Sequence, residues 1–511
     1  MSILYKIPVI LYLLIPSYLC AGNPTEIAQG VLDRLYKAHG HFNPKKPKLQ
    51  LVSSKENVAS YLKYNNTIQL EEQAYLLCRS FGKDSLSVLA FLLGHELIHA
   101  IQIHNVLPKT SFISYHKSLK SSLEIEQNAD IQGIFVSYLA GFNTIELIPQ
   151  IIERMYTVYG LRSKNIRGYP TEEERKSSYK DVKEQAKQLI ELFNLSNELA
   201  VIEEYQTSIQ CLEYITRLYQ GKEVYNNLGV NYTLMALNFT GRNTESYIYP
   251  LELDWNSRIK KPKSGRGEEE LDPIIRIKQQ QLFLKAKIYF SLASDLDPDY
   301  TQADLNIFCV HIMMNELDEA RQFYRNHLRG IANKKGNTEI FLKIKSANAI
   351  LSAKLNNSTE ALKIWNDLLQ EKNKIIAVQA EQNISNLTKN RYLQALQPIL
   401  PCASINKKEV PEVDRKLRNL ETNQWIQLDS MNSLEKNKID NSTIYACIVD
   451  GSKIFQVQKI PVQSKLKLDV KKDQLRSLGN NQWIYICKKE SIAYILNEQE
   501  EAVTIIRYLY F

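Results

Sequence analysis

The chain has few histidines, no closely spaced cysteines and no long basic run, and each shortage argues against a class of function. Only eight of its 511 residues are histidine. The seven cysteines never form the C-x-x-C pairs of a cysteine-bound zinc site. The formal net charge of +8 is mild for this length, and the one basic cluster, residues 258–266, is followed by three glutamates, as in a solvated loop. A cysteine-based metal site and an extended nucleic-acid surface are therefore not expected.

The composition indicates a folded chain of several domains. Hydrophobic residues make up 44% and charged residues 23%, which is ordinary for globular proteins. A length of 511 residues exceeds one ordinary core, so two to four domains are expected. We predict an α+β multidomain protein that is mainly α.

The first 22 residues predict an export signal. Lys6 supplies a weak positive start, residues 7–19 an apolar core, and Cys20-Ala21-Gly22 a cleavage region of small residues. Cleavage and release is the favoured interpretation, with an uncleaved anchor and a lipoprotein formed at Cys20 as alternatives. No later segment is expected to be long and apolar enough to cross a bilayer. In a bacterium with two membranes, the protein would be periplasmic or associated with the envelope.

The most informative motif is H-E-x-x-H at His95, Glu96 and His99, which follows an apolar run. Residues four apart lie on the same face of a helix, so both histidines can bind one metal ion. Glu96 can then act as general base on a water at that metal, as in zinc peptidases. The alternative is a buried helix whose two histidines are only hydrogen-bonded.

A second motif, E-x-x-A-D, begins at Glu126, 27 residues after His99. Glu126 and Asp130 also share a helix face. A glutamate can complete a three-ligand zinc site that keeps a fourth position open for water. An aspartate can hold a ligand histidine by its other ring nitrogen.

The pattern H-E-x-x-H-x-x-G-x-x-H is not present. Gln102 stands at its glycine position and Asn105 at its third histidine, while His104 is one residue out of register. A site with three histidine ligands is therefore not expected, and His104 is interpreted as an ordinary exposed or capping histidine.

At these residues the chain resembles the HtpX-type gluzincin metallopeptidases, a family that also includes the CaaX prenyl proteases. The match covers about residues 45 to 195 and includes a third segment, residues 168–175. There Pro170, Glu174 and Arg175 agree with the family, but Tyr169 stands where histidine is usual.

The resemblance implies Zn²⁺ bound by His95, His99 and Glu126, with Glu96 as base and Asp130 behind a ligand histidine. Tyr169 departs from the family's histidine, and its hydroxyl is a candidate donor to an oxyanion; Arg175 is a candidate electrostatic helper. The alternative for Arg175 is a simple salt bridge.

Periodicity predicts a first domain over residues 23–200. We expect helices over residues 24–40 and 118–140, the second ending at Gly141, and strands at residues 49–52 and 68–70. In a gluzincin, the edge of a strand such as 68–70 holds an extended substrate.

Residues 201–400 predict a helical region resembling tetratricopeptide repeats, interrupted by an insertion at 241–272, with a plain helical bundle as the alternative. Residues 405–511 predict a small β-rich domain in which the block around Trp425 returns around Trp483, 58 residues later. These tryptophans favour core positions over a carbohydrate or peptide platform. Cys447 and Cys487 are a candidate disulfide, and most other cysteines are expected to be buried free thiols.

The sequence thus predicts an exported zinc-dependent metalloendopeptidase. Its expected substrates are unfolded or misassembled proteins, its partners bind the repeat region, and its setting is protein quality control in the envelope. The alternative is a chaperone or scaffold based on the repeats, with a structural or latent zinc site.

Overall fold

The computed structural model is mainly helical. It describes residues 23–40, 45–102, 109–111, 121–161, 172–239, 247–251, 272–332 and 339–388, together with strand segments between 424 and 510. The predicted signal, residues 1–22, and most of the predicted insertion lie outside the described residues.

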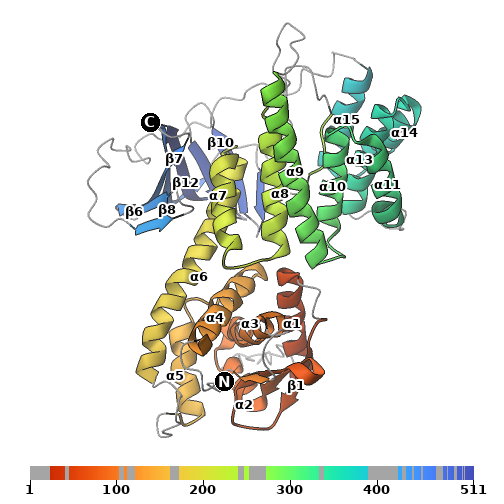
Figure 1. Cartoon of the computed structure of the whole chain (residues 1–511). Coiled ribbons are helices and arrows are strands. Elements are labelled where there is room, and N and C mark those ends of the chain that lie inside the picture. Colours follow the sequence, from red (N-terminus) through yellow and green to blue (C-terminus); the bar gives the residue numbers. More distant parts are fainter. Residues whose placement is uncertain are drawn as a thin grey trace, which may run out of the picture.

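The N-terminal lobe comprises five helices and one four-stranded sheet, at the bottom of Figure 1. Its helices are α1 (Pro24–His39), α2 (Glu72–Arg79), α3 (Ser85–Gln102), α4 (Ser121–Leu139) and α5 (Ile148–Val158). Its strands are β1 (Lys48–Val52), β2 (Ala59–Leu62), β3 (Thr67–Glu71) and β4 (Lys109–Ser111), in the order β1-β3-β2-β4. Asn23 caps α1 by accepting from the Thr25 amide at 3.0 Å.

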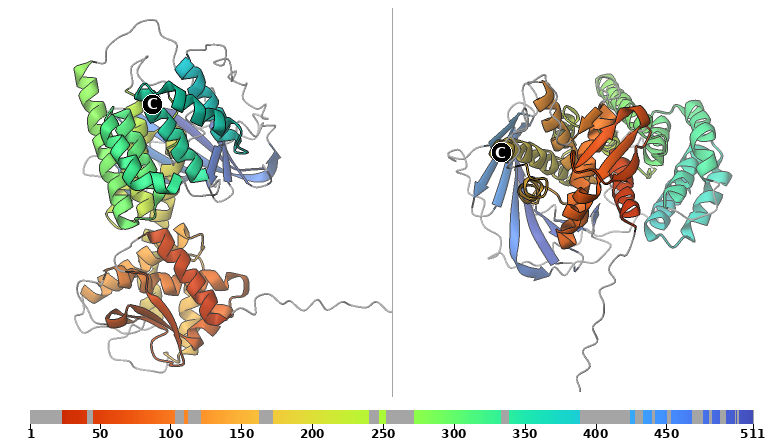
Figure 2. Two further views of the ribbon diagram at one scale, coloured as in Figure 1. Left: turned by 90° about the vertical axis from the view of Figure 1, so that its right-hand side faces the viewer. Right: turned by 90° about the horizontal axis from the view of Figure 1, so that it is seen from below.

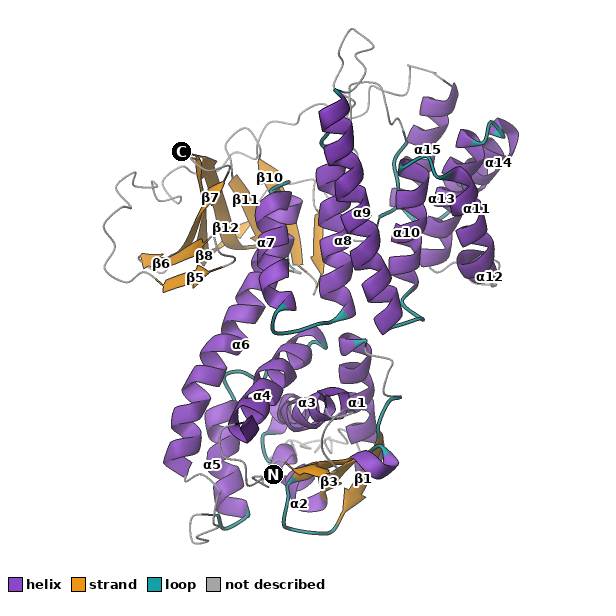
Figure 3. Cartoon of the chain, in the orientation of Figure 1, coloured by secondary structure: helices purple, strands orange, loops and turns teal. Residues whose placement is uncertain are grey.

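The central helix of this lobe is α3, which packs against α1, α4 and the sheet (Figure 3). Every residue from Val88 to Ala100 is buried, as its nearly unbroken apolar sequence requires. The stretch Gly82–Gln102 is also long and apolar enough to cross a membrane, and 72% of its most apolar window is buried inside the protein. The expectation that no segment after residue 22 passes this test was therefore wrong. Core helices of globular proteins pass it as well.

Both predicted strands of this lobe are present, as β1 and β3. However, β3 pairs with β1 on one side and with β2 on the other, so it has no free edge to hold a substrate. That part of the expectation was wrong, because β2, which was not predicted, pairs with the side of β3 that was expected to be free. Within the described sheet, the outer strand on that side is β4, which pairs with β2.

The 30-residue helix α6 (Glu172–Val201) leaves the N-terminal lobe and leads to the helical lobe above it (Figure 1). The helices of this second lobe are α7 (Tyr205–Thr216), α8 (Lys222–Leu237), α9 (Pro273–Leu296), α10 (Thr301–Met313), α11 (Leu317–Phe323), α12 (Arg329–Ala332), α13 (Glu339–Lys354), α14 (Ser358–Leu369) and α15 (Lys374–Thr388), with a π-helical turn at Tyr324–Leu328. Helices that follow one another pack together, notably α8 with α9 and α13 with α14.

The described middle of the predicted insertion is part of the core. Tyr249 and Leu251 are buried, and the Ile248 amide donates to Asn383 Oδ1 of α15 at 2.7 Å. Gln379 and Asn383 both donate to the Ile248 carbonyl at 3.1 Å. This short segment is therefore a structural part of the helical lobe.

The C-terminal region forms one eight-stranded sheet beside α6 and α7 (Figures 1 and 2). Its strands are β5 (Gln424–Gln427), β6 (Ser433–Ile439), β7 (Ser442–Val449), β8 (Lys453–Lys467), β9 (Arg476–Gly479), β10 (Gln482–Cys487), β11 (Ile492–Leu496) and β12 (Glu501–Tyr510), in the order β5-β6-β7-β8-β12-β11-β10-β9. The meanders β5-β6-β7 and β10-β11-β12 flank the long strand β8. Trp425 and Trp483 start equivalent strands, and their side chains lie outside the described residues.

The expected Cys447–Cys487 disulfide is wrong. The two cysteines lie on β7 and β10, which three other strands separate. Neighbouring strands lie about 4.8 Å apart, so the separation is well beyond the ~7 Å Cα limit of a disulfide. Three other cysteines, Cys78, Cys211 and Cys309, are buried free thiols, as predicted.

One side-chain contact and one ion pair join the parts of the molecule. Lys222 of the helical lobe donates to Asp297 Oδ2 at 2.5 Å, and its alkyl chain packs against Gly40 at the end of α1. Gly40 has a φ of 69°, and any Cβ there would collide with Lys222. Lys459 of β8 donates to Glu198 Oε1 of α6 at 2.6 Å, which fastens the sheet to the long helix.

Candidate metal centre

Helices α3 and α4 approach very closely where two glycines face each other. A Cβ on Gly133 of α4 would lie 2.8 Å from the His95 amide nitrogen, and one on Gly94 of α3 would lie 2.9 Å from the Gly133 carbonyl oxygen. The Ser137 hydroxyl lies within hydrogen-bonding distance of the carbonyl oxygens of Ala90, at 3.1 Å, and Gly133, at 2.7 Å. Because glycine has no side chain, the two backbones can approach closely at Gly94 and Gly133. The buried Ser137 hydroxyl lies between them.

This crossing aligns the motif residues of the two helices. Nε2 of His95 lies 3.0 Å from Nε2 of His99 and 3.2 Å from Oε2 of Glu126. Nε2 of His99 lies 3.5 Å from Oε1 of Glu126. A tetrahedral zinc ion with bonds of about 2.0–2.1 Å holds its ligand atoms about 3.3 Å apart. The two Nε2 atoms and the two Glu126 oxygens therefore have the spacing and the chemistry of a two-histidine, one-carboxylate site.

Asp130 lies on the far side of the first histidine. Asp130 follows Glu126 by one turn of α4, and its Oδ1 is 2.7 Å from His95 Nδ1. A proton on Nδ1 is held by this carboxylate, so Nε2 faces the other ligands. Such a bond fixes the ring orientation and makes the imidazole a more basic ligand.

The electrostatics of the cluster favour positive charge at its centre. Burial alone would lower the pKa of His95, but the Asp130 and Glu126 carboxylates overcome it and raise that pKa to about 10. Burial and the charge on His95 lower the pKa of His99. Although burial opposes it, the two histidines hold the pKa of Glu126 well below its usual range. A field that holds a proton on a buried imidazole also attracts a metal cation.

Glu96 is a buried carboxyl beside the cluster. Burial raises its pKa to about 8, and the charge on His95 opposes this shift. The backbone amide of Tyr61 in β2 also favours the charged form, but neither carboxylate oxygen makes a hydrogen bond of normal geometry with the described residues. A buried carboxyl with spare hydrogen-bonding capacity next to such a cluster is suited to hold a water molecule.

The cluster is almost completely buried. His95, Glu96 and His99 are 0% exposed, whereas the Glu126 side chain is 15% exposed. Among these four side chains, the Glu126 side alone has contact with solvent. The segments that follow α3 and precede α6 lie outside the described residues.

The structure thus brings together five of the seven predicted site residues: His95, Glu96, His99, Glu126 and Asp130. Tyr169 lies outside the described residues, as do Pro170, His104 and Asn105. Arg175 lies in the first turn of α6, but its side chain is not described, so neither oxyanion role is tested.

Sequence reasoning missed three residues that shape the site: Gly94, Gly133 and Tyr61. Gly94 directly precedes His95, and Gly133 follows Asp130 by three positions. Small residues beside both motifs were therefore an available signal of close helix packing. No local pattern relates Tyr61 to Glu96, because the packing of α3 against β2 brings them together.

Comparison of the chain with protein families and with curated proteins finds no match.

Proposed function

We propose that this protein is a zinc-dependent metalloendopeptidase of the HtpX-like gluzincin type. The observation that carries the proposal is the convergence of three potential ligand side chains from α3 and α4 beside the buried carboxyl of Glu96, which makes no hydrogen bond of normal geometry with the described residues. Two buried histidines that bind no metal would not need a carboxylate facing both Nε2 atoms, nor a second carboxylate hydrogen-bonded to the other nitrogen of one ring.

Each residue has a distinct role in this proposal. His95, His99 and Glu126 hold the zinc, and Asp130 orients His95. Bound zinc would polarise the scissile carbonyl and lower the pKa of a water molecule to about 7. Glu96 removes the proton from the attacking water and delivers it to the leaving amine as the C–N bond breaks. Tyr169 and Arg175 stay candidates for stabilising the oxyanion.

The wider architecture belongs to the same proposal. Residues 23–200 form the peptidase domain, and the helices of 201–400 are tetratricopeptide-like repeats that bind substrates or partners. Residues 405–511 form an accessory β-rich domain. An export signal at residues 1–22 places the enzyme outside the cytoplasm, where it hydrolyses unfolded or misassembled proteins in envelope quality control.

The alternative is a repeat-based chaperone or scaffold with a latent metal site. The observation that favours it is the 0% exposure of His95, Glu96 and His99, since a substrate carbonyl must reach the metal. In this alternative the helical lobe is the working surface and the metal centre stabilises the fold.

The discriminating experiment compares wild type with Glu96→Gln for bound zinc, by elemental analysis, and for cleavage of casein. Zinc in both proteins with cleavage by wild type alone supports the peptidase. Zinc in both with no cleavage of several unfolded substrates would reject it in favour of the latent site.

The ligand assignment is tested by Glu126→Ala, which is expected to lose zinc. His311→Ala is the matched control, because His311 also pairs with a carboxylate, Glu316, at 2.6 Å, but far from the site in sequence. Full zinc retention by Glu126→Ala would contradict the assignment.

A further inference from the structure

The exposed apolar side chains of this protein are concentrated on one helix. Of twelve large apolar side chains that are exposed among the described residues, six lie on α9. Four of them follow one face of that helix, with exposed fractions of 55% for Ile277, 49% for Leu284, 60% for Ile288 and 39% for Leu292. We call these four residues the α9 stripe.

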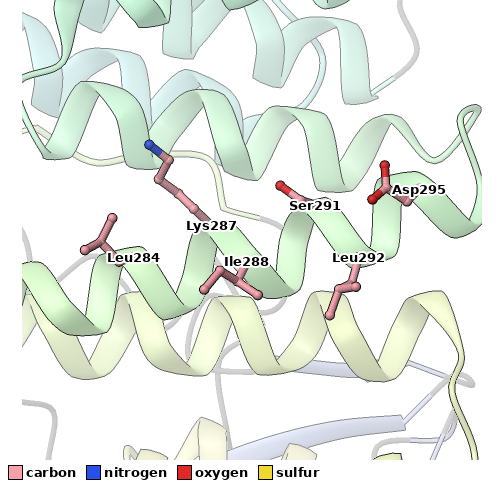
Figure 4. A pocket seen from close by; sticks show the side chains of 6 residues that line it. All are labelled: Leu284, Lys287, Ile288, Ser291, Leu292 and Asp295. Atoms are coloured by element: carbon pink, nitrogen blue, oxygen red, sulfur yellow. The ribbon is translucent and has the colours of Figure 1, made fainter.

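The α9 stripe faces away from the body of the helical lobe. Phe283, Ala286, Phe290 and Ala293 form the opposite, buried side of the same helix. Figure 4 shows Leu284, Ile288 and Leu292 along α9, while Lys287 reaches toward the adjacent helix. Among the described residues, those that line the shallow hollow there all belong to α9, and no second described element forms an opposing wall.

Most charges around the stripe are positive. Helix α9 carries Arg276, Lys278, Lys285 and Lys287, and its one carboxylate, Asp295, lies at its C-terminal end and lines the hollow. Lys287 is neutralised by Glu316 at 2.8 Å. For Arg276, Lys278 and Lys285, the described part of the chain offers no carboxylate partner; Lys278 and Lys285 lie over the rings of Phe239 and Tyr232 of the α8 side.

We propose that the α9 stripe and its cations dock this protein on an anionic lipid surface. Apolar side chains on an outer helix face enter the boundary between headgroups and acyl chains, while lysines at the edge reach the phosphates. Each cation near an anionic membrane strengthens binding about fivefold, and the effect falls with salt.

Charge and shape favour this occupant over two others. A second copy of the same face would bring three cations that have no carboxylate partner among the described residues against three more. A helical peptide usually binds in a groove with two walls, and the hollow on α9 has one. A lipid surface needs no opposing wall and supplies the missing negative charge.

The test is co-sedimentation of the full chain with vesicles of phosphatidylcholine, with and without phosphatidylglycerol, at low and high salt. The expected result is extra binding to the anionic vesicles that salt weakens. Because this readout needs no metal and no cleavage, it stands or falls separately from the proposed peptidase.

Two variants assign the binding to α9. The double variant Lys278→Glu/Lys285→Glu is expected to reduce the anionic increment by on the order of 25-fold or more. Leu284→Gln/Ile288→Gln is expected to reduce it on the order of tenfold. Leu76→Gln is the matched control, since Leu76 is 59% exposed on α2 and should bind as wild type.

Several results would overturn the proposal. One such result is equal binding to vesicles with and without phosphatidylglycerol. Another is that both α9 variants keep the extra binding to anionic vesicles. Dimerisation without lipid that Leu284→Gln/Ile288→Gln abolishes would assign the stripe to a second copy. Binding of an acidic amphipathic peptide without binding of vesicles would assign it to a protein partner. Circular dichroism verifies that these surface variants are folded.

Discussion

The closest helix contact in the metal centre gives the sharpest test of its geometry, the substitution Gly133→Ala. The added Cβ would lie 2.8 Å from His95 N, 3.0 Å from Gly94 C and 3.1 Å from His95 Cα. All three are backbone atoms, so no side chain can rotate to make room. Helix α4 must therefore retreat from α3 by roughly 0.5–1 Å to restore ordinary contacts.

That retreat acts directly on the ligand set. Glu126 and Asp130 move with α4, whereas His95 and His99 stay on α3. Metal–ligand distances are defined to within about 0.2 Å, so a displacement of this size weakens coordination. We expect the affinity for metal to fall on the order of 10- to 100-fold, as it does when a group that holds a metal ligand in place is lost. We expect the free energy of unfolding to fall by about 1–3 kcal/mol, because the added methyl group overpacks the contact between the helices.

The assay titrates the metal-free protein with cobalt(II) against a competing chelator, and a chemical denaturation series measures stability. Gly30→Ala is the matched control, because a Cβ on Gly30 meets no atom within 4 Å. In the middle of α1 it should stabilise the protein by about 0.5–1 kcal/mol and leave metal binding unchanged.

The reasoning is refuted if Gly133→Ala binds cobalt with wild-type affinity and an unchanged ligand-field spectrum. In that case the helix spacing would not control the ligand geometry. Loss of stability without loss of affinity would likewise show that the contact serves packing alone.

Three further outcomes follow from single contacts. Asp130→Asn should weaken zinc binding about 10- to 100-fold in a chelator competition, because His95 loses its carboxylate partner. Lys222→Met should lower the free energy of unfolding by about 3–5 kcal/mol in a denaturant titration, because it leaves Asp297 buried without its cation. The double variant Lys222→Met/Asp297→Asn should recover part of that loss. Burial, then the nearby Glu203, raises the pKa of Glu204 to about 7, so this group favours folding below its unfolded pKa and loses that contribution as pH rises toward 7. Glu204→Gln should therefore stabilise the protein by about 1–2 kcal/mol more at pH 8 than at pH 4.5, after allowance for its partial exposure, in denaturant titrations at both values.

The local motifs predicted which side chains share a helix face in the cluster of His95, His99 and Glu126. Residues four apart on a helix share a face, so the pairs His95/His99 and Glu126/Asp130 followed from spacing alone. The helix expected over residues 118–140 is α4, Ser121–Leu139, and the expected stop at Gly141 has a φ of 82°. Within each helix, the periodicity of the backbone determined the geometry.

Features that depend on pairing between distant segments were harder to predict. Strand β2 contains Ala59, Ser60, Tyr61 and Leu62, all buried, so it lacks the alternation that reveals a half-exposed strand. Missing β2 also led to the wrong edge for β3. The proposed cysteine pair failed for the same reason, since strand order in a meander is not visible in the spacing of two cysteines.

The burial of Glu96 leads to a last prediction, on the relation between stability and activity. Helix α3 is otherwise a core helix, and it carries three polar side chains in its buried stretch, His95, Glu96 and His99. Asp130 and Glu126 offset the burial of the histidines, but the described residues give no hydrogen bond of normal geometry to Glu96. A buried polar group without a partner costs about 1–3 kcal/mol, and a charged one costs more.

Glu96→Gln keeps the shape of the side chain and removes its titration. Burial raises the pKa of Glu96 to about 8, so at neutral pH folding requires a carboxyl that is ionised in the unfolded chain to take up a proton, and the amide removes that cost. The metal-free protein should therefore become more stable, by about 1–3 kcal/mol, in denaturant titrations with a chelator present at neutral pH. Glu72→Gln is the control, because it makes the same change on the half-exposed first turn of α2. A gain in stability together with a loss of casein cleavage would mean that the fold keeps a costly carboxyl for its chemistry. A loss of stability in Glu96→Gln would instead show that Glu96 holds the core together, which is the role expected of a structural residue in a latent site.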